Sequence, residues 1–145
     1  MKTLAIKYGI RMFAGFTLFF LIMHFLGQSQ NFNLRIFNGV IHLGFMYLAI
    51  KAYKEQFPES LDNYLNGVAV AMYSSAIGIL PFSIFLMIFL DQTPHLMAEF
   101  KAHTPIGEYL TPVTASVFVF MEGLIISLIG GYVLTRIVLM NRIKA

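Results

Sequence analysis

Long apolar runs alternate with short polar segments along this chain. Four of the runs are about as long as the roughly 20 residues that an α-helix needs to cross a hydrocarbon core about 30 Å thick. The pattern predicts an all-α polytopic membrane protein, in which a single domain, 1–145, forms an antiparallel bundle of four transmembrane helices. The predicted spans are residues 8–26, 34–53, 67–90 and 109–134.

A fifth helix is predicted between the third and fourth spans. The pair Thr93-Pro94 has the form of a helix start, with threonine as the N-cap and proline at the first helical position. Segment 94–103 then carries Leu96, Met97 and Phe100 at helical spacing. We therefore expect a short amphipathic helix on the membrane surface.

Composition agrees with exposure to lipid and excludes several functions. Hydrophobic residues make up 58% of the 145 residues and charged residues 12%, against about 25% charged residues in soluble domains. The chain has no cysteine, which excludes disulfides, thiolate metal sites and thiol redox catalysis. The net charge is +3, but the basic residues do not form a single patch, so nucleic-acid binding is not expected. Without a phosphate loop, a nucleophile elbow or paired carboxylates in a span, we expect no enzymatic activity and no cofactor.

Basic residues predict the orientation of the bundle. With four spans, both termini and the middle loop share one side, and that side carries eight of the ten Lys and Arg residues. The other side carries only Arg35 and Lys101. Because Lys and Arg in short loops stay in the cytoplasm, both termini are predicted to be cytoplasmic. The eight residues are Lys2, Lys7, Arg11, Lys51, Lys54, Arg136, Arg142 and Lys144.

Small residues recur at helical spacing in the third and fourth spans. Lipid supplies no hydrophobic force between helices, and small residues let two backbones approach closely. We therefore expect these spans to pack tightly, against each other or against a partner, either another membrane protein or a second copy. The positions are Gly67, Ala71, Ser75 and Gly78 in the third span and Gly123, Ser127 and Gly131 in the fourth.

Glu122 is the carboxylate that lies within a predicted span. An ionised carboxylate at such a depth costs several kcal/mol, so Glu122 is expected to be protonated and to face the bundle or a partner. A rise of about 1.5 Å per residue from the outer edge puts Glu122 about 15 Å deep, His42 about 12 Å and Tyr47 about 20 Å. We therefore predict an intramembrane polar cluster of Glu122, His42 and Tyr47.

Two interpretations of Glu122 stay open. In the leading one, Glu122 hydrogen-bonds within the bundle or at a subunit contact, and the protein is a non-enzymatic accessory or scaffold subunit. In the alternative, Glu122 titrates in a small proton-coupled transporter. A water-accessible cavity that reaches Glu122 favours transport, and a dry contact with another chain favours the scaffold.

The histidines predict no metal centre. His24 and His42 lie in neighbouring spans but differ in depth by about 9 Å, which is unfavourable for axial ligation of one haem. His95, Glu99 and His103 are four residues apart along the surface helix. Adjacent members could share a metal, but the outer pair is about 12 Å apart, so a solvated helix face is favoured.

Three segments resemble a known family. They are residues 6–10 (IKYGI), residues 49–54 (AIKAYK), and residues 123–129 (GLIISLI), which precede a basic tail. Together they are similar to the bacterial membrane family named domain of unknown function 4199. The resemblance extends over nearly the whole chain and implies four spans in a bacterial inner membrane, but it implies no activity and no site residues.

Fusion reporters test the predicted orientation. A fluorescent protein fused after residue 145 is expected to fluoresce, because that end is cytoplasmic, and alkaline phosphatase at the same point is expected to be inactive. Phosphatase inserted between Thr104 and Gly107 is expected to be active. The reverse pattern of activities would contradict the orientation.

Overall fold

The structure is a computed structural model of the chain and describes residues 1–29, 35–58 and 63–143. The described part is helical almost throughout. In order, its elements are α1 (Lys2–Phe25), α2 (Arg35–Gln56), α3 (Tyr64–Gln92), α4 (Pro94–His103), a single 3₁₀ turn (Gly107–Tyr109) and α5 (Pro112–Ile143).

The four long helices confirm the predicted fold class. α1, α2, α3 and α5 are each long and apolar enough to cross a membrane, so the chain is an all-α, four-span membrane protein. α4 has the predicted bounds, 94–103. The long helices extend beyond the predicted spans because hydropathy marks the part of a helix that contacts lipid, while the helix itself ends where its capping groups lie.

Side-chain caps define where α3 and α5 begin. The Asn63 side chain accepts a hydrogen bond from the Leu65 backbone N–H at 3.1 Å, which caps α3 three residues before the predicted span. At α5 the Thr111 hydroxyl accepts from the Thr114 N–H at 3.1 Å, while the Thr114 hydroxyl accepts from the Thr111 N–H at 2.7 Å. These reciprocal bonds start α5 at Pro112, so the predicted span that begins at 109 includes three residues that precede the helix.

Gly27 ends α1 and turns the chain. It has a φ angle of 67°, the left-handed region that glycine adopts without strain. The Gln28 N–H bonds the Met23 carbonyl at 2.8 Å and the Gly27 N–H bonds the His24 carbonyl at 3.0 Å. This pair of bonds is the Schellman pattern of helix termination.

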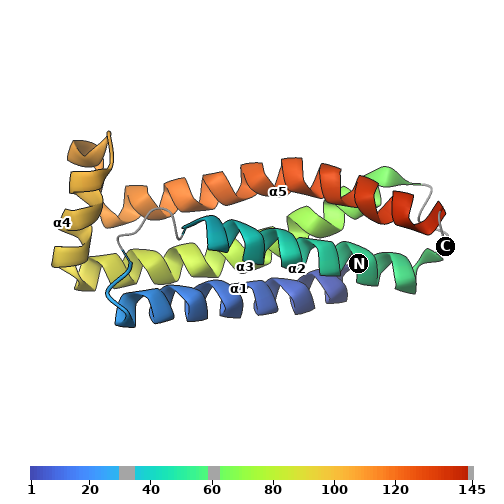
Figure 1. Ribbon diagram of the computed structural model, residues 1–145, viewed down its shortest axis with the longest axis horizontal. Coiled ribbons are helices and arrows are strands. Elements are labelled where there is room, and N and C mark those ends of the chain that lie inside the picture. Colours follow the sequence, from blue (N-terminus) through green and yellow to red (C-terminus); the bar gives the residue numbers. More distant parts are fainter. Residues whose placement is uncertain (30–34, 59–62, 144–145) are drawn as a thin grey trace.

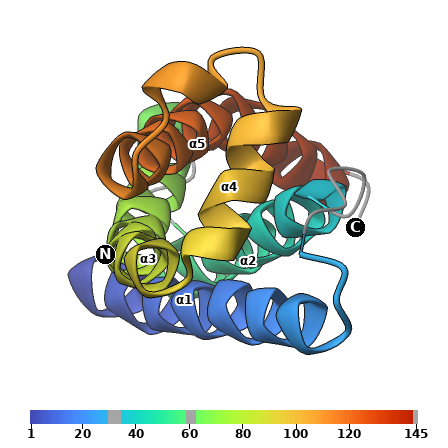
Figure 2. The ribbon, with the colours of Figure 1, turned by 90° about the vertical axis from the view of Figure 1, so that its left-hand side faces the viewer.

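The four spans pack around α3, and α4 covers one end of the bundle. α3 contacts α1, α2 and α5 and is the most buried of the four spans. α4 runs across the bundle rather than along it (Figure 1), and in the end-on view it lies over the space that the other helices enclose (Figure 2). Both termini lie towards the opposite end, as four spans require.

Glycines permit close approach between α3 and its neighbours. A Cβ atom on Gly78 of α3 would lie 2.9 Å from the Gly9 carbonyl oxygen of α1, and one on Gly9 would lie 2.6 Å from Ile77. A Cβ atom on Gly67 would lie 2.5 Å from the Thr135 side chain of α5. Larger side chains at these positions would push the helices apart.

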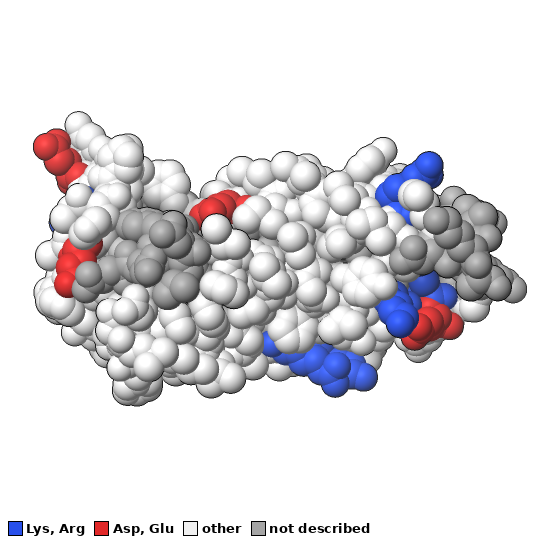
Figure 3. All heavy atoms as spheres, in the orientation of Figure 1, with Lys and Arg blue, Asp and Glu red and all other residues white. Residues whose placement is uncertain are grey.

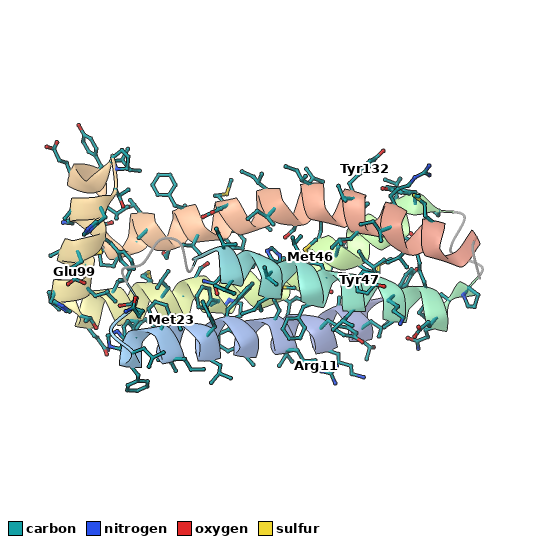
Figure 4. The ribbon with its side chains drawn as sticks, in the orientation of Figure 1. Arg11, Met23, Met46, Tyr47, Glu99 and Tyr132 are labelled. Carbon is teal, nitrogen blue, oxygen red and sulfur yellow. The ribbon has the colours of Figure 1, made fainter. Side chains whose placement is uncertain are left out.

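Tyrosines on three helices lie at a similar level of the bundle. Met46 and Ala71 both contact the position of a Cβ atom on Gly131, so their near neighbours Tyr47, Tyr73 and Tyr132 lie at a similar level, and Figure 4 shows Tyr47 and Tyr132 at the same place along the bundle. From Pro112 to Tyr132, α5 rises about 30 Å, which equals the hydrocarbon thickness. Tyr47, which was predicted to join a polar cluster, therefore lies level with Tyr132, and tyrosines are enriched at membrane–water interfaces.

Charge is distributed along the long axis of the bundle. On the face shown in Figure 3, Lys and Arg atoms gather towards the end that carries the termini. Arg11 is exposed on α1, and its guanidinium carbon lies 5.4 Å from the ring centroid of Tyr8, one turn nearer the terminal end. The side chain thus reaches back towards that end, as expected for a cation that leaves the hydrocarbon.

Leucine substitutions at two glycines test the close packing of the helices. Gly78→Leu is expected to lower the free energy of unfolding by about 1–3 kcal/mol, because the new side chain meets α1 backbone atoms. Gly44→Leu is the matched control, because nothing lies within 4 Å of a Cβ atom there. Thermal unfolding in detergent measures both variants, and equal losses of stability would contradict the packing.

Candidate functional site

The second span begins short of the end that α4 covers. α1 reaches that end, where the rings of His24 and Phe89 of α3 have centroids 4.9 Å apart. α2 bonds to α3 much further down, because His42 Nε2 lies 2.9 Å from Ser75 Oγ. Arg35 precedes His42 by seven residues, so α2 begins about 10 Å short of the level of Phe89. Figure 1 shows the same offset between the end of α1 and the start of α2.

A cavity of about 550 Å³ lies in this half of the bundle. All four spans line it, and Phe100, Thr104 and Ile106 of the α4 region border it as well. Met23 of α1, labelled in Figure 4 near the α4 end, also lines it. Six phenylalanines form much of its wall: Phe16, Phe19, Phe20, Phe82, Phe100 and Phe118. Volumes of 300–1,000 Å³ with apolar walls and a few polar groups are typical of small-molecule sites.

Some residues that line the cavity are exposed on the side of the bundle. Among its lining residues, Ile36 at the start of α2 is 70% exposed and Phe118 on α5 is 54% exposed. Glu122, one turn further along α5, also lines the cavity and is exposed. These exposed side chains belong to α2 and α5, which are both long and apolar enough to cross a membrane.

Polar side chains converge at the deep end of the cavity. Asn38 and His42 are four residues apart and so share one face of α2. Glu122 precedes Gly123, which contacts Ile79 of α3 near the same depth. Among the described residues, the Asn38 Oδ1 atom is buried and has no hydrogen-bond partner. The cavity lining therefore includes a carboxylate and an amide among its polar groups.

His42 joins three helices at the floor of the cavity. Its side chain is buried, with 3% exposure, and Nε2 lies 2.9 Å from Ser75 Oγ of α3 and 3.1 Å from Ser127 Oγ of α5. Ser127 Oγ also donates to the Gly123 carbonyl at 2.6 Å. Because a hydroxyl has one proton, Ser127 accepts from His42, and this network assigns the imidazole proton to Nε2. The ring edge of Phe16 packs against the imidazole at a centroid distance of 5.7 Å.

The predicted polar cluster is therefore only partly assembled. His42 and Glu122 border the same cavity, but Tyr47 is not among its lining residues. Tyr47 is five residues after His42, about 140° around the helix, so it lies on a different face of α2. Glu122 lines the cavity and is exposed, and the expectation that it faces the bundle or a partner stays a prediction.

All seven predicted packing residues are buried at contacts between helices of this chain. Gly67, Gly123 and Gly131 lie at the contact of α3 with α5, and Gly78 lies at the contact of α3 with α1. Ala71 meets Gly131, at 3.1 Å from the position of a Cβ atom there. Ser75 and Ser127 are fully buried and bond to His42, a polar role that their small size did not indicate.

Asn38 is a polar cavity residue that was not predicted from the sequence. A signal was present, because Asn38 lies one helical turn before His42 within the second span. Amides in spans are costly when unsatisfied, so an asparagine at this spacing from a buried histidine is informative.

The other histidines do not form a metal or haem site. His24 contacts Phe89 and His42 contacts Ser75, positions about 21 Å apart along α3, which is too far for one haem iron. On α4, His95 Nε2 lies 3.1 Å from Glu99 Oε1, while His103 Nδ1 bonds the Glu99 backbone carbonyl at 2.9 Å. The described residues contain no group of three metal-ligating side chains.

Comparison of the chain with protein-family models, curated proteins and solved structures finds no match.

Serine replacements test the histidine contact. The double variant Ser75→Ala, Ser127→Ala leaves His42 Nε2 without these hydroxyls, and an unsatisfied buried polar group costs about 1–3 kcal/mol of stability. Ser74→Ala with Ser116→Ala is the control, because those hydroxyls bond carbonyls of their own helices. Thermal unfolding in detergent compares the two pairs, and equal stability of both would show that the contact does not hold the helices together.

Proposed function

We propose that the protein is a small membrane transporter for an amphiphilic molecule, with Glu122 as its proton-exchanging group. The observation that carries this proposal is the cavity of about 550 Å³, which Glu122 lines together with exposed residues of α2 and α5. A binding molecule can enter such a cavity directly from lipid. The described lining residues suit binding and present no catalytic constellation, so the proposed activity is non-enzymatic.

The position of Glu122 supports proton exchange. It is ten residues from Pro112 and ten from Tyr132, so it lies about 15 Å from each proposed boundary. Ionisable residues within membrane spans are rare and often belong to proton or ion pathways. Binding at the cavity rim can therefore be linked to release of a proton.

The scaffold interpretation has less support from the described surface. It relied on the small residues of the third and fourth spans to pack against a partner. Those seven positions are buried within the chain, at contacts of α3 with α5 and α1. The exposed face of α5 instead carries large apolar side chains such as Ile125, Leu128 and Ile129, which suit lipid.

The cellular location is part of the proposal. We infer a bacterial inner membrane from the resemblance to the family domain of unknown function 4199, and cytoplasmic termini from the distribution of Lys and Arg. In that orientation the cavity lies in the outer half of the membrane, and a substrate would enter or leave on that side.

Flux in reconstituted vesicles tests this function. Protein in proteoliposomes is given a pH gradient and a panel of fluorescent amphiphiles, cationic, neutral and anionic. Wild type is expected to drive gradient-dependent flux of one class, and Glu122→Gln is expected to reduce that flux to the level of protein-free vesicles, because the amide cannot exchange a proton. Glu99→Gln, on α4 and outside the cavity, is the control and is expected to keep the flux.

A different result supports the scaffold. If Glu122→Gln is as stable as wild type and no probe crosses faster with wild type than without protein, then Glu122 acts as a structural hydrogen-bonding group.

A further inference from the structure

A pair of basic residues lies on the outer face of α1, within a span. Lys7 and Arg11 are four residues apart, so their side chains share one face of the helix, and both are exposed. Figure 3 shows basic atoms over α1, apart from those at the end that carries the termini, and Figure 4 labels Arg11 there. The two cations therefore face the surroundings of the bundle rather than its interior.

The backbone of Arg11 lies deep in the bundle. A Cβ atom on Gly78 would lie 2.9 Å from Met12 Cβ, so Arg11 is almost level with Gly78, the middle residue of the 29 in α3. A cation on the outside of a span is costly at such a depth, and a long side chain reduces that cost by extending towards the head groups. Arg11 does so, because its guanidinium lies over the ring of Tyr8, one turn nearer the termini.

Tyr8 holds this guanidinium in a defined place. The Tyr8 side chain packs against the buried residues Ala49, Tyr53 and Val70, so its ring is fixed to α2 and α3. The guanidinium carbon of Arg11 lies 5.4 Å from the ring centroid. A guanidinium that stacks on an aromatic face keeps its N–H groups at its edge, where they match two oxygen atoms of a phosphate.

The described part of the chain places no counter-charge beside these cations. Among its residues Lys51 pairs with Glu55 at 3.9 Å, whereas Lys7 and Arg11 have no carboxylate within such a distance. Glu122 belongs to α5, and Figure 2 shows α5 on the opposite side of the bundle from α1. Like charges at this spacing on a helix repel each other, so an anion that contacts both is favourable, and the surrounding lipid can supply it.

Apolar side chains continue the same face of α1 towards α4. Ala14, Leu18 and Ile22 follow Arg11 at helical spacing, and all three are exposed. A phospholipid has the same order of parts, with a charged phosphate followed by acyl chains. The face therefore matches a phospholipid in both charge and direction.

We propose that Lys7 and Arg11 bind the phosphate of an anionic phospholipid, such as phosphatidylglycerol, whose acyl chains lie along Ala14 and Leu18. A zwitterionic phospholipid carries its own ammonium near the phosphate, so it attracts two cations less strongly. The site is on the opposite side of the bundle from α5, and it does not depend on the transport that Glu122 is proposed to drive.

Fluorescence quenching by brominated lipids locates the bound lipid. The chain has no tryptophan, so Ala14→Trp, three residues after Arg11, is a single reporter at the site. Met121→Trp, at a position 50% exposed on α5, is the depth-matched control, because Gly123, two residues along α5, contacts Ile79 at the middle of α3. Phosphatidylcholine vesicles carry varied mole fractions of brominated phosphatidylglycerol, or of brominated phosphatidylcholine with the same chains.

The ratio of binding constants, phosphatidylglycerol over phosphatidylcholine, follows from quenching at each mole fraction. At Ala14→Trp this ratio is expected to be about ten, since each cation near an anionic lipid contributes several-fold. At Met121→Trp it is expected to be about one, because no basic residue of α5 lies nearby at that depth. Equal ratios at the two reporters overturn the proposal.

Charge variants separate this pair from the general basic character of the end that carries the termini. In the Ala14→Trp protein, Lys7→Gln with Arg11→Gln is expected to lower the ratio to about one, and both side chains are exposed, so the protein is expected to fold. Lys51→Gln with Arg136→Gln removes the same charge from α2 and α5 and is expected to keep the ratio. An unchanged ratio in the first double variant, or equal losses in both, overturns the proposal.

Discussion

The hydrogen bonds of His42 inside the bundle determine the position of α2 along the neighbouring helices. In hydrocarbon no solvent can satisfy a buried imidazole, so His42 must lie where protein groups can bond it. Ser75 and Ser127, on two different helices, supply those groups at 2.9 Å and 3.1 Å. Sliding α2 by one turn, about 5.4 Å, would break both bonds. The contact therefore fixes the position of α2 along α3 and α5.

The cavity follows from that position. With His42 at the level of Ser75, α2 begins about 10 Å below the end of α1, and in that half of the bundle no described residue of α2 lies beside the ends of α1 and α3. α4 crosses the open end, and its buried Leu96 and Met97 pack against the bundle. The same contact that stabilises the bundle thus leaves a space at membrane depth, with Asn38 and Glu122 on its border.

Local elements could be predicted from the sequence because each depends on neighbouring residues. Apolar run length predicted the four spans, and Thr93-Pro94 predicted the start of α4. Small-residue spacing identified positions of close approach, but not which helix each would meet, since Gly78 contacts α1 rather than α5. The predicted depths of His42 and Tyr47 assumed that all four spans begin at the same level. This assumption is wrong for α2, which begins about 10 Å below the end of α1. The cavity itself depends on tertiary register, for which no local pattern in the sequence exists.

Disulfide cross-linking tests the register of α2 most directly, because the chain has no cysteine of its own. A Cβ atom on Gly130 would lie 2.7 Å from Leu43 Cδ2, so the pair Leu43→Cys, Gly130→Cys is expected to form a disulfide rapidly in the membrane. Gly123 lies seven residues, about two turns, earlier on α5, where Leu43 would lie if α2 reached the end that α4 covers. The account predicts that Leu43→Cys, Gly123→Cys does not cross-link. Efficient cross-linking of that pair, with none at Gly130, would contradict it.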